Sequence, residues 1–102
     1  MNNFVIVTNL DGCVEAFYID EANMVAHTWQ VQAENKLIWS EAEALFGTAE
    51  GSTGPLTEAV RVAATTDRYG QIQVVALTKS KEYFICYQIG SVWNGWFKIE
   101  QQ

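Results

Sequence analysis

The sequence has few cysteines and few basic residues. Its two cysteines, Cys13 and Cys86, are too few for a disulfide scaffold, so we expect two buried or half-buried thiols. Six Lys and Arg residues stand against twelve Asp and Glu, which gives a formal net charge of −6. Binding to nucleic acid requires cations that neutralise phosphates, and an anionic membrane attracts the same sign of charge. The composition therefore disfavours a nucleic acid or an anionic membrane surface as the partner.

Long hydrophobic runs are missing from the start of the chain. The segment M-N-N-F-V-I-V-T has only four consecutive apolar residues and no basic region. This pattern fits neither a signal peptide nor a membrane-spanning helix. We therefore expect a protein that is made in the cytoplasm and is not inserted into a membrane, with secretion by another route as the alternative.

Motifs for catalysis and for metal binding are also lacking. The single histidine, His27, has no second histidine or thiolate cluster at ligand spacing. The chain has no G-x-S-x-G motif, and residues 51–54 lack the lysine of a phosphate loop. Most carboxylates, Glu15 among them, are expected to be solvated in turns or on the polar side of strands. The sequence predicts no catalytic residue, no metal, no cofactor and no enzymatic activity.

Aromatic residues, in contrast, are abundant. They make up 13% of the 102 residues and include four Trp and four Tyr, in a chain that is 49% hydrophobic. That is too apolar for a disordered chain, and the length suits one domain or two copies of a small unit. An aromatic surplus in a small protein indicates an aromatic core or an aromatic binding surface.

The hydrophobic pattern predicts an all-β protein. The expected strands cover residues 4–8, 13–19, 24–31, 37–39, 59–64, 71–77, 82–89 and 91–99. The β-branched run at residues 4–8 is typical of a strand buried on both faces. Asp11-Gly12 forms a hairpin turn because glycine accepts a positive φ, and Asn23 suits the same conformation in the next connection.

Two segments are less regular. Residues 40–46 combine a capping-box spacing with residues that favour helix. A helix that ends before Gly47 would have only seven residues, which is barely two turns. We expect a short irregular edge strand there, with a helical turn as the alternative. Residues 47–56 are rich in Gly, Ser and Thr and hold the one proline, so they read as a linker between residues 1–46 and residues 57–102.

The two halves repeat the same pattern. Gly12 and Gly70 are 58 positions apart, as are Trp29 and Tyr87, whereas Trp39 and Trp93 are 54 apart. The difference falls in the loop after residue 30, where lengths vary freely.

Four short strands in an up-and-down order describe one blade of a β-propeller. Two blades cannot close a ring, so identical chains are expected to join head to tail in a cyclic homo-oligomer. A trimer with six blades is favoured, because four blades curve too tightly for tryptophan-sized side chains.

The first unit also resembles a known family. Asn9-x-D-G-x-V-E-x-F, M-V-x-H-x-W-Q and W-S-x-x-x-x-L are similar to the blade of the PLL-type bacterial β-propeller lectins, and the second unit follows through Gly70 to the Trp93-Asn94-Gly95-Trp96 close. The resemblance covers about 80 of the 102 residues. It departs at Cys13, where the family has Arg, and at Ile85, where it has His.

The resemblance implies multivalent binding of fucose-like sugars in clefts between adjacent blades. Sugar recognition needs a flat aromatic face and a few fixed donors and acceptors for the hydroxyl groups. The candidate ligand-binding residues are Trp93, Trp96, Asn94, Trp29, Trp39, His27, Asn9, Asp11 and Tyr87.

Two alternatives stay open at this point. The tryptophans can simply pack between sheets and the histidine can tether a strand, which would describe a structural or protein-interaction propeller without a sugar site. A small α+β regulatory domain is the other reading, if residues 40–46 and 57–64 are helices.

Overall fold

Residues 3–102, the part of the chain that the computed structural model describes, form eight β-strands and no helix. The strands are β1 (Phe4–Thr8), β2 (Val14–Ile19), β3 (Val25–Trp29), β4 (Glu43–Ala44), β5 (Ala59–Thr66), β6 (Ile72–Thr78), β7 (Tyr83–Ile89) and β8 (Val92–Lys98). They build two antiparallel sheets with the orders β1-β2-β3-β4 and β5-β6-β7-β8. The all-β class is confirmed. Nothing in the described residues is a helix long and apolar enough to cross a membrane.

The α+β alternative is wrong, because residues 40–46 and 57–64 contain no helix. The edge strand expected over residues 40–46 is reduced to the two residues of β4, which pair with β3. Residues 37–39, expected to open the fourth strand, contribute one isolated bridge between Trp39 and Gln30. A short, interrupted edge strand is one way in which a sheet limits pairing with other chains.

The strand registers confirm the internal repeat. In the first sheet Glu15 lies opposite Trp29, and in the second sheet Gln73 lies opposite Tyr87, so both partners move by 58 positions. Beyond residue 30 the offset is 54, because Gln30 bridges Trp39 as Gln88 pairs with Trp93. Both offsets therefore describe equivalent places in the two sheets.

The turns repeat as well. Gly12 and Gly70 both have a positive φ, and each N–H donates to the backbone oxygen three positions earlier at 2.9 and 3.0 Å. Asn23 and Lys81 occupy the same left-handed position in the following turn, with φ values of 62° and 66°. The conformation is thus set by the turn and not by residue type alone, since Lys81 lacks the usual tolerance for positive φ.

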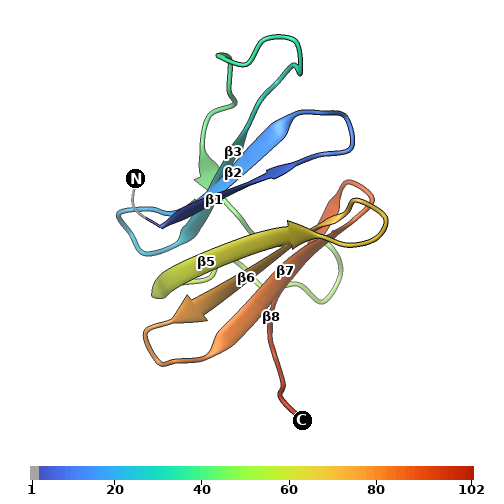
Figure 1. Ribbon diagram of the computed structural model, residues 1–102. Helices are drawn as coiled ribbons and strands as arrows, with labels where there is room; N and C mark the ends of the chain where they lie inside the picture. Colours follow the sequence, from blue (N-terminus) through green and yellow to red (C-terminus); the bar gives the residue numbers. More distant parts are fainter. Residues whose placement is uncertain (1–2) are drawn as a thin grey trace.

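The two sheets lie face to face, with β5 next to β1 and β2 (Figure 1). We call the two surfaces in contact the inner faces. The inner face of the first sheet contributes Phe17, Val25 and Leu45, which are fully buried. On the second sheet every other residue of β6 is buried, as expected for a strand with one covered face.

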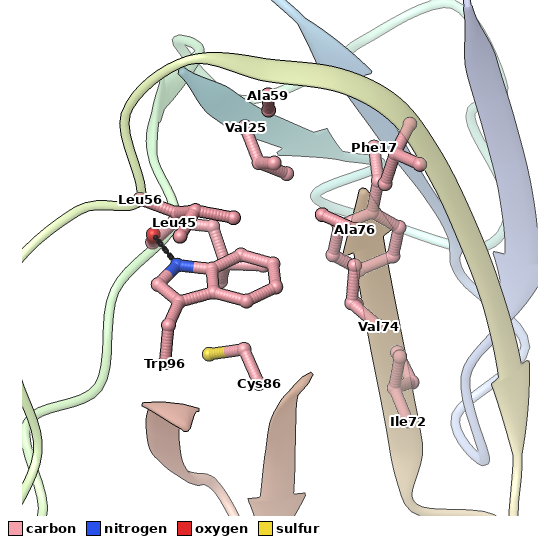
Figure 2. Packing of buried hydrophobic residues seen from close by; sticks show 11 residues of the cluster. Phe17, Val25, Leu45, Leu56, Ala59, Ile72, Val74, Ala76, Cys86 and Trp96 are labelled. Atoms are coloured by element: carbon pink, nitrogen blue, oxygen red, sulfur yellow. Dashed lines mark hydrogen bonds between the residues drawn. The ribbon is translucent and has the colours of Figure 1, made fainter. Parts of the chain in front are cut away.

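Trp96 joins the two inner faces in the middle of the core. Figure 2 shows its indole packed among aliphatic side chains, with the ring nitrogen directed at the backbone oxygen of Leu45. The Nε1 of Trp96 donates to that oxygen at 2.8 Å, and only 3% of the residue is exposed. The equivalent position of the first sheet is Ala42, so this anchor exists once per chain.

The connection between the sheets runs along the edge of β8. Thr48 N donates to the backbone oxygen of Trp93, and Thr53 N donates to that of Gly95. A side chain at Gly47 would place its Cβ 2.5 Å from the Gly95 nitrogen, so only glycine lets the two backbones approach so closely. The connection therefore covers a sheet edge and fixes the arrangement of the sheets.

The faces turned away from the core are apolar too, and we call them the outer faces. In β1, residues alternate between half-buried and exposed, with 55% of Phe4 and 59% of Ile6 exposed. The prediction that residues 4–8 are buried on both faces is therefore wrong for the single chain. The physical reason is that each sheet has only one neighbouring sheet to cover it.

Replacing Trp96 by Phe should destabilise the protein by about 1–3 kcal/mol, because the buried oxygen of Leu45 loses its donor. Urea denaturation of both proteins at one fixed protein concentration measures the difference. Leu37→Ala is the control, since Leu37 is almost fully exposed. Equal stability of the Trp96→Phe variant and the unchanged protein would contradict the bridging role.

Candidate functional site

A cavity opens between the two sheets at the end of the strands where β2 begins and β3 ends. Its volume is about 250 Å³. The β1–β2 turn, β2 and β3 form one wall, and β7 and β8 of the second sheet form the other. Because the walls come from different units of the repeat, the cavity lies at a junction that neither unit makes alone.

Five of the nine candidate residues meet in this cavity, namely Asn9, Asp11, His27, Trp29 and Trp93. Four more residues complete the lining, namely Cys13, Glu15, Gln30 and Gln88. Of this second group, Gln30 and Gln88 were expected to supply polar groups for sugar recognition, whereas Cys13 and Glu15 were not expected at the site. One signal was available for Glu15, because strand alternation places it on the same face as Phe17.

Glu15 forms the polar floor of the cavity. Its Oε2 lies 2.7 Å from His27 Nδ1, and its Oε1 accepts a hydrogen bond from Asn9 Nδ2 at 3.2 Å. Only 5% of Glu15 and 6% of His27 are exposed. The expectation of a solvated Glu15 is therefore wrong. A buried carboxylate needs such partners, and here both of its oxygens have one.

Aromatic rings surround the histidine. The His27 ring stacks on Phe17 with 5.9 Å between centroids and 9° between planes. Trp29 is tilted against it at 5.0 Å, and Trp93 of the second sheet meets it edge-on at 6.0 Å. The two tryptophans are half-buried and come from opposite walls. They thus offer flat apolar surfaces on either side of the polar floor.

The mouth of the cavity is held by side chain to backbone hydrogen bonds. Gln30 Oε1 accepts from Val14 N at 2.8 Å, and the equivalent Gln88 Oε1 accepts from Ile72 N at 3.4 Å. Asp11 Oδ1 accepts from Cys13 N at 2.9 Å. Gln88 and Asp11 each keep a further polar atom for a ligand, namely the amide nitrogen and the second carboxylate oxygen, whereas the amide nitrogen of Gln30 donates to the backbone oxygen of Lys36 at 3.4 Å.

The two thiols are buried and reduced, as expected. Burial raises the pKa of Cys13, and the neighbouring Asp11 carboxylate raises it further. Burial alone raises the pKa of Cys86 to about 12. Both thiols therefore stay protonated at neutral pH, and the Cys13 thiol adds a weakly polar group to the cavity instead of a nucleophile.

The other four candidates lie elsewhere. Trp96 is buried in the core, and its ring nitrogen is used there. Tyr87 lies on the outer face of β7 beside Phe97, at 6.2 Å between centroids. Asn94 donates to the backbone oxygen of Val92 at 3.2 Å, and Trp39 stands on the outer face of the first sheet. Of the pair Trp93 and Trp96, only Trp93 reaches the cavity.

No group of three metal-ligating side chains with suitable geometry occurs within residues 3–102. A larger hollow of about 670 Å³ lies at the opposite end of the strands, beside the β2–β3 turn. None of the nine candidates lines it. The cavity with Glu15 and His27, in contrast, brings five of the nine together.

Comparison of the chain with protein-family models and with curated proteins found no match.

Removing the Glu15 carboxylate should destabilise the fold strongly. Glu15→Ala leaves the buried His27 ring and the Asn9 amide without their shared partner, which costs about 1–3 kcal/mol for each unsatisfied group. Glu43→Ala is the matched control: it removes a carboxylate 3.5 Å from the other ring nitrogen, and because 63% of the Glu43 side chain is exposed we expect about 1 kcal/mol or less. Chemical denaturation compares the two variants, and equal losses would contradict the buried pair.

Proposed function

We propose that this chain is a non-enzymatic, lectin-like protein that binds a sugar in the cavity between its two sheets. The observation that carries the proposal is the convergence of Trp29 and Trp93, from different sheets, on a polar floor. An aromatic face covers the C–H side of a sugar ring, and fixed polar groups select its hydroxyls. Asn9, Asp11 and Gln88 line the cavity, and their polar atoms would bond the hydroxyls of a sugar ring held there.

The size and charge of the cavity support a small neutral ligand. Protein pockets for drug-sized molecules span roughly 300–1,000 Å³, so a cavity of about 250 Å³ suits a single sugar ring. Its lining includes the carboxylates of Asp11 and Glu15 and no Lys or Arg. A sugar that carries a carboxylate or phosphate would meet like charge there.

The resemblance to PLL-type lectins points to the same place, since those proteins bind fucose-like sugars between adjacent blades. Seven residues of the quoted motifs line the cavity, namely Asn9, Asp11, Glu15, His27, Trp29, Gln30 and Trp93. The family's arginine is replaced by Cys13, so the hydrogen bonds that an arginine would donate must come from other groups, and Gln88 is the nearest in kind.

We propose further that the two sheets are blades of a propeller that several chains complete. The outer face of the first sheet has an apolar hollow of about 470 Å³. Its apolar lining is Phe4, Ile6, Val14, Ala16 and Trp39, and the polar residues Thr28 and Gln30 complete it. The repeat maps the five apolar residues and Thr28 onto Val62, Ala64, Ile72, Val74, Trp93 and Cys86, all of which pack in the inner core.

The inner face of the first sheet is likewise equivalent to the outer face of the second sheet. Phe17 and Val25 of the first sheet are fully buried, but their equivalents Val75 and Tyr83 lie on the outer face of the second sheet and are half-buried or exposed. One chain thus has two outer faces, and each is equivalent to an inner face of the other unit. Repetition of the same contact between chains would cover both faces, and such a head-to-tail contact closes into a ring.

A trimer with six blades is the assembly we favour, for the reason of curvature given above. It would carry its sugar sites in several copies, and multivalency raises the avidity of weak sites. A second reading has a specific observation in its favour, because the floor of the cavity is fully bonded within the protein. In that reading the propeller is a structural or protein-interaction module without a sugar ligand.

A glycan array followed by calorimetry with methyl α-fucoside tests the sugar site. We expect binding, and a loss of tenfold or more in affinity for Asn9→Ala and for Trp29→Ala. Asn94→Ala is the matched control, because Asn94 lies outside the cavity and should bind as before. A folded ring that binds no glycan would overturn the lectin proposal and favour the structural reading.

Native mass spectrometry tests the ring. We expect a trimer, and we expect Phe4→Asp and Ile6→Asp to give folded monomers, because both residues are exposed in the single chain and a charge there opposes burial against another copy. Ala22→Asp adds the same charge in an exposed turn at the sheet edge and should leave the trimer intact. A compact monomer of the unchanged protein in dilute solution would sink the proposal.

A further inference from the structure

The cavity continues into a wider cleft at the same end of the strands. This cleft has a volume of about 620 Å³, and it shares Asn9, Asp11 and Gln88 with the cavity. The shared residues form the boundary between the two spaces. A ligand that reaches these polar groups from the cavity is therefore already at the border of the cleft.

The cleft is built by turns from both sheets. Leu10, at the tip of the β1–β2 turn, rests on Gly70 of the β5–β6 turn, where an added Cβ would lie 2.5 Å from the Leu10 Cδ2 atom. The positive φ of Gly70 is what favours glycine at this position. The contact places the two turns side by side at the cleft.

An aromatic ring stands in the wall of the cleft. Tyr69 is 68% exposed and Leu10 is 81% exposed, although both are large apolar groups. The guanidinium carbon of Arg68 lies 6.0 Å from the centroid of the Tyr69 ring, on one of its faces. This contact restrains the ring and leaves its second face for a ligand.

Polar groups are fixed at the far side of the cleft. The Gln71 side chain accepts a hydrogen bond from Gly90 N and donates to Asp67 Oδ2 at 3.4 Å. The bond from Gly90 ties the β7–β8 turn to the β5–β6 turn, and the exposed hydroxyl of Ser91 lies at the rim beside it. The cleft therefore combines one flat ring with donors and acceptors at its border, as the cavity does.

The cleft would also stay open in a ring of chains. Its lining comes from the β1–β2, β5–β6 and β7–β8 turns and from Gln88 near the end of β7, all at the same end of the strands. The proposed contacts between chains use the faces of the sheets. The turns at the strand ends are not covered when the faces of two sheets pack together. The cleft is therefore accessible in both the single chain and the ring.

We infer that the cleft is a second sugar subsite, and that the ligand is an oligosaccharide of neutral sugars with its terminal residue in the cavity and its next residue on Tyr69. The inference rests on the proposed function, because it takes the cavity as the site of the terminal sugar. The cavity holds one ring only, whereas the cleft has room for the residue that follows it along the chain.

Calorimetry with two probes tests this inference. The probes are methyl α-fucoside and a fucosyl-galactose disaccharide, which share the terminal sugar. We expect the disaccharide to bind about tenfold more tightly, a gain of about 1.4 kcal/mol. Tyr69→Ala should remove that gain and leave the affinity for methyl α-fucoside unchanged. Tyr69→Phe, the matched control, keeps the ring and should keep the gain.

The outcomes separate the two proposals. Equal affinities for both probes, or a gain that survives Tyr69→Ala, would overturn the subsite and leave the sugar site of the cavity standing. Absence of binding to either probe would overturn the proposed function and the subsite with it. Since Tyr69 is exposed, unchanged affinity of its variants for methyl α-fucoside also shows that they are folded.

Discussion

Each sheet of this protein is apolar on both faces, and most of the structure follows from that constraint. A four-stranded antiparallel sheet with one apolar face buries it against one partner, whereas a sheet with two apolar faces needs two. The chain meets half of this requirement by folding its two units face to face around Phe17, Val74 and Trp96. The remaining faces are equivalent in position to the buried ones, and this equivalence is the physical basis for proposing that copies of the chain cover each other.

The cavity between the sheets is a consequence of the same stacking. At one end of the core the inner faces change from apolar side chains to a mixture of aromatic and polar ones, and the cavity lies between the two sheets there. The buried pair of Glu15 and His27 marks this transition. It keeps a carboxylate next to the core without leaving either of its oxygens unpaired, and it holds the histidine between rings from both sheets.

The two units differ at this site. The positions of Glu15 and His27 are Gln73 and Ile85 in the second unit, although the strand registers are the same. Trp96 has no counterpart in the first unit, where the equivalent residue is Ala42. The scaffold is thus shared, while the polar floor and the central anchor each occur once per chain. A ring of such chains would have two kinds of junction, and only the junction within a chain would carry the buried pair.

The sequence by itself determined the all-β class, seven of the eight strand positions to within a few residues and the repeat, because side-chain alternation and turn glycines are local signals. It also indicated Asn9, Asp11, His27, Trp29 and Trp93 through their types and their places in the repeat. It could not separate Trp93 from Trp96, since both are strand tryptophans three positions apart and only the packing of the two sheets decides which one enters the core. Nor could it show that Glu15 is buried or that Gln88 faces it across the cavity, because those positions depend on how one sheet lies on the other.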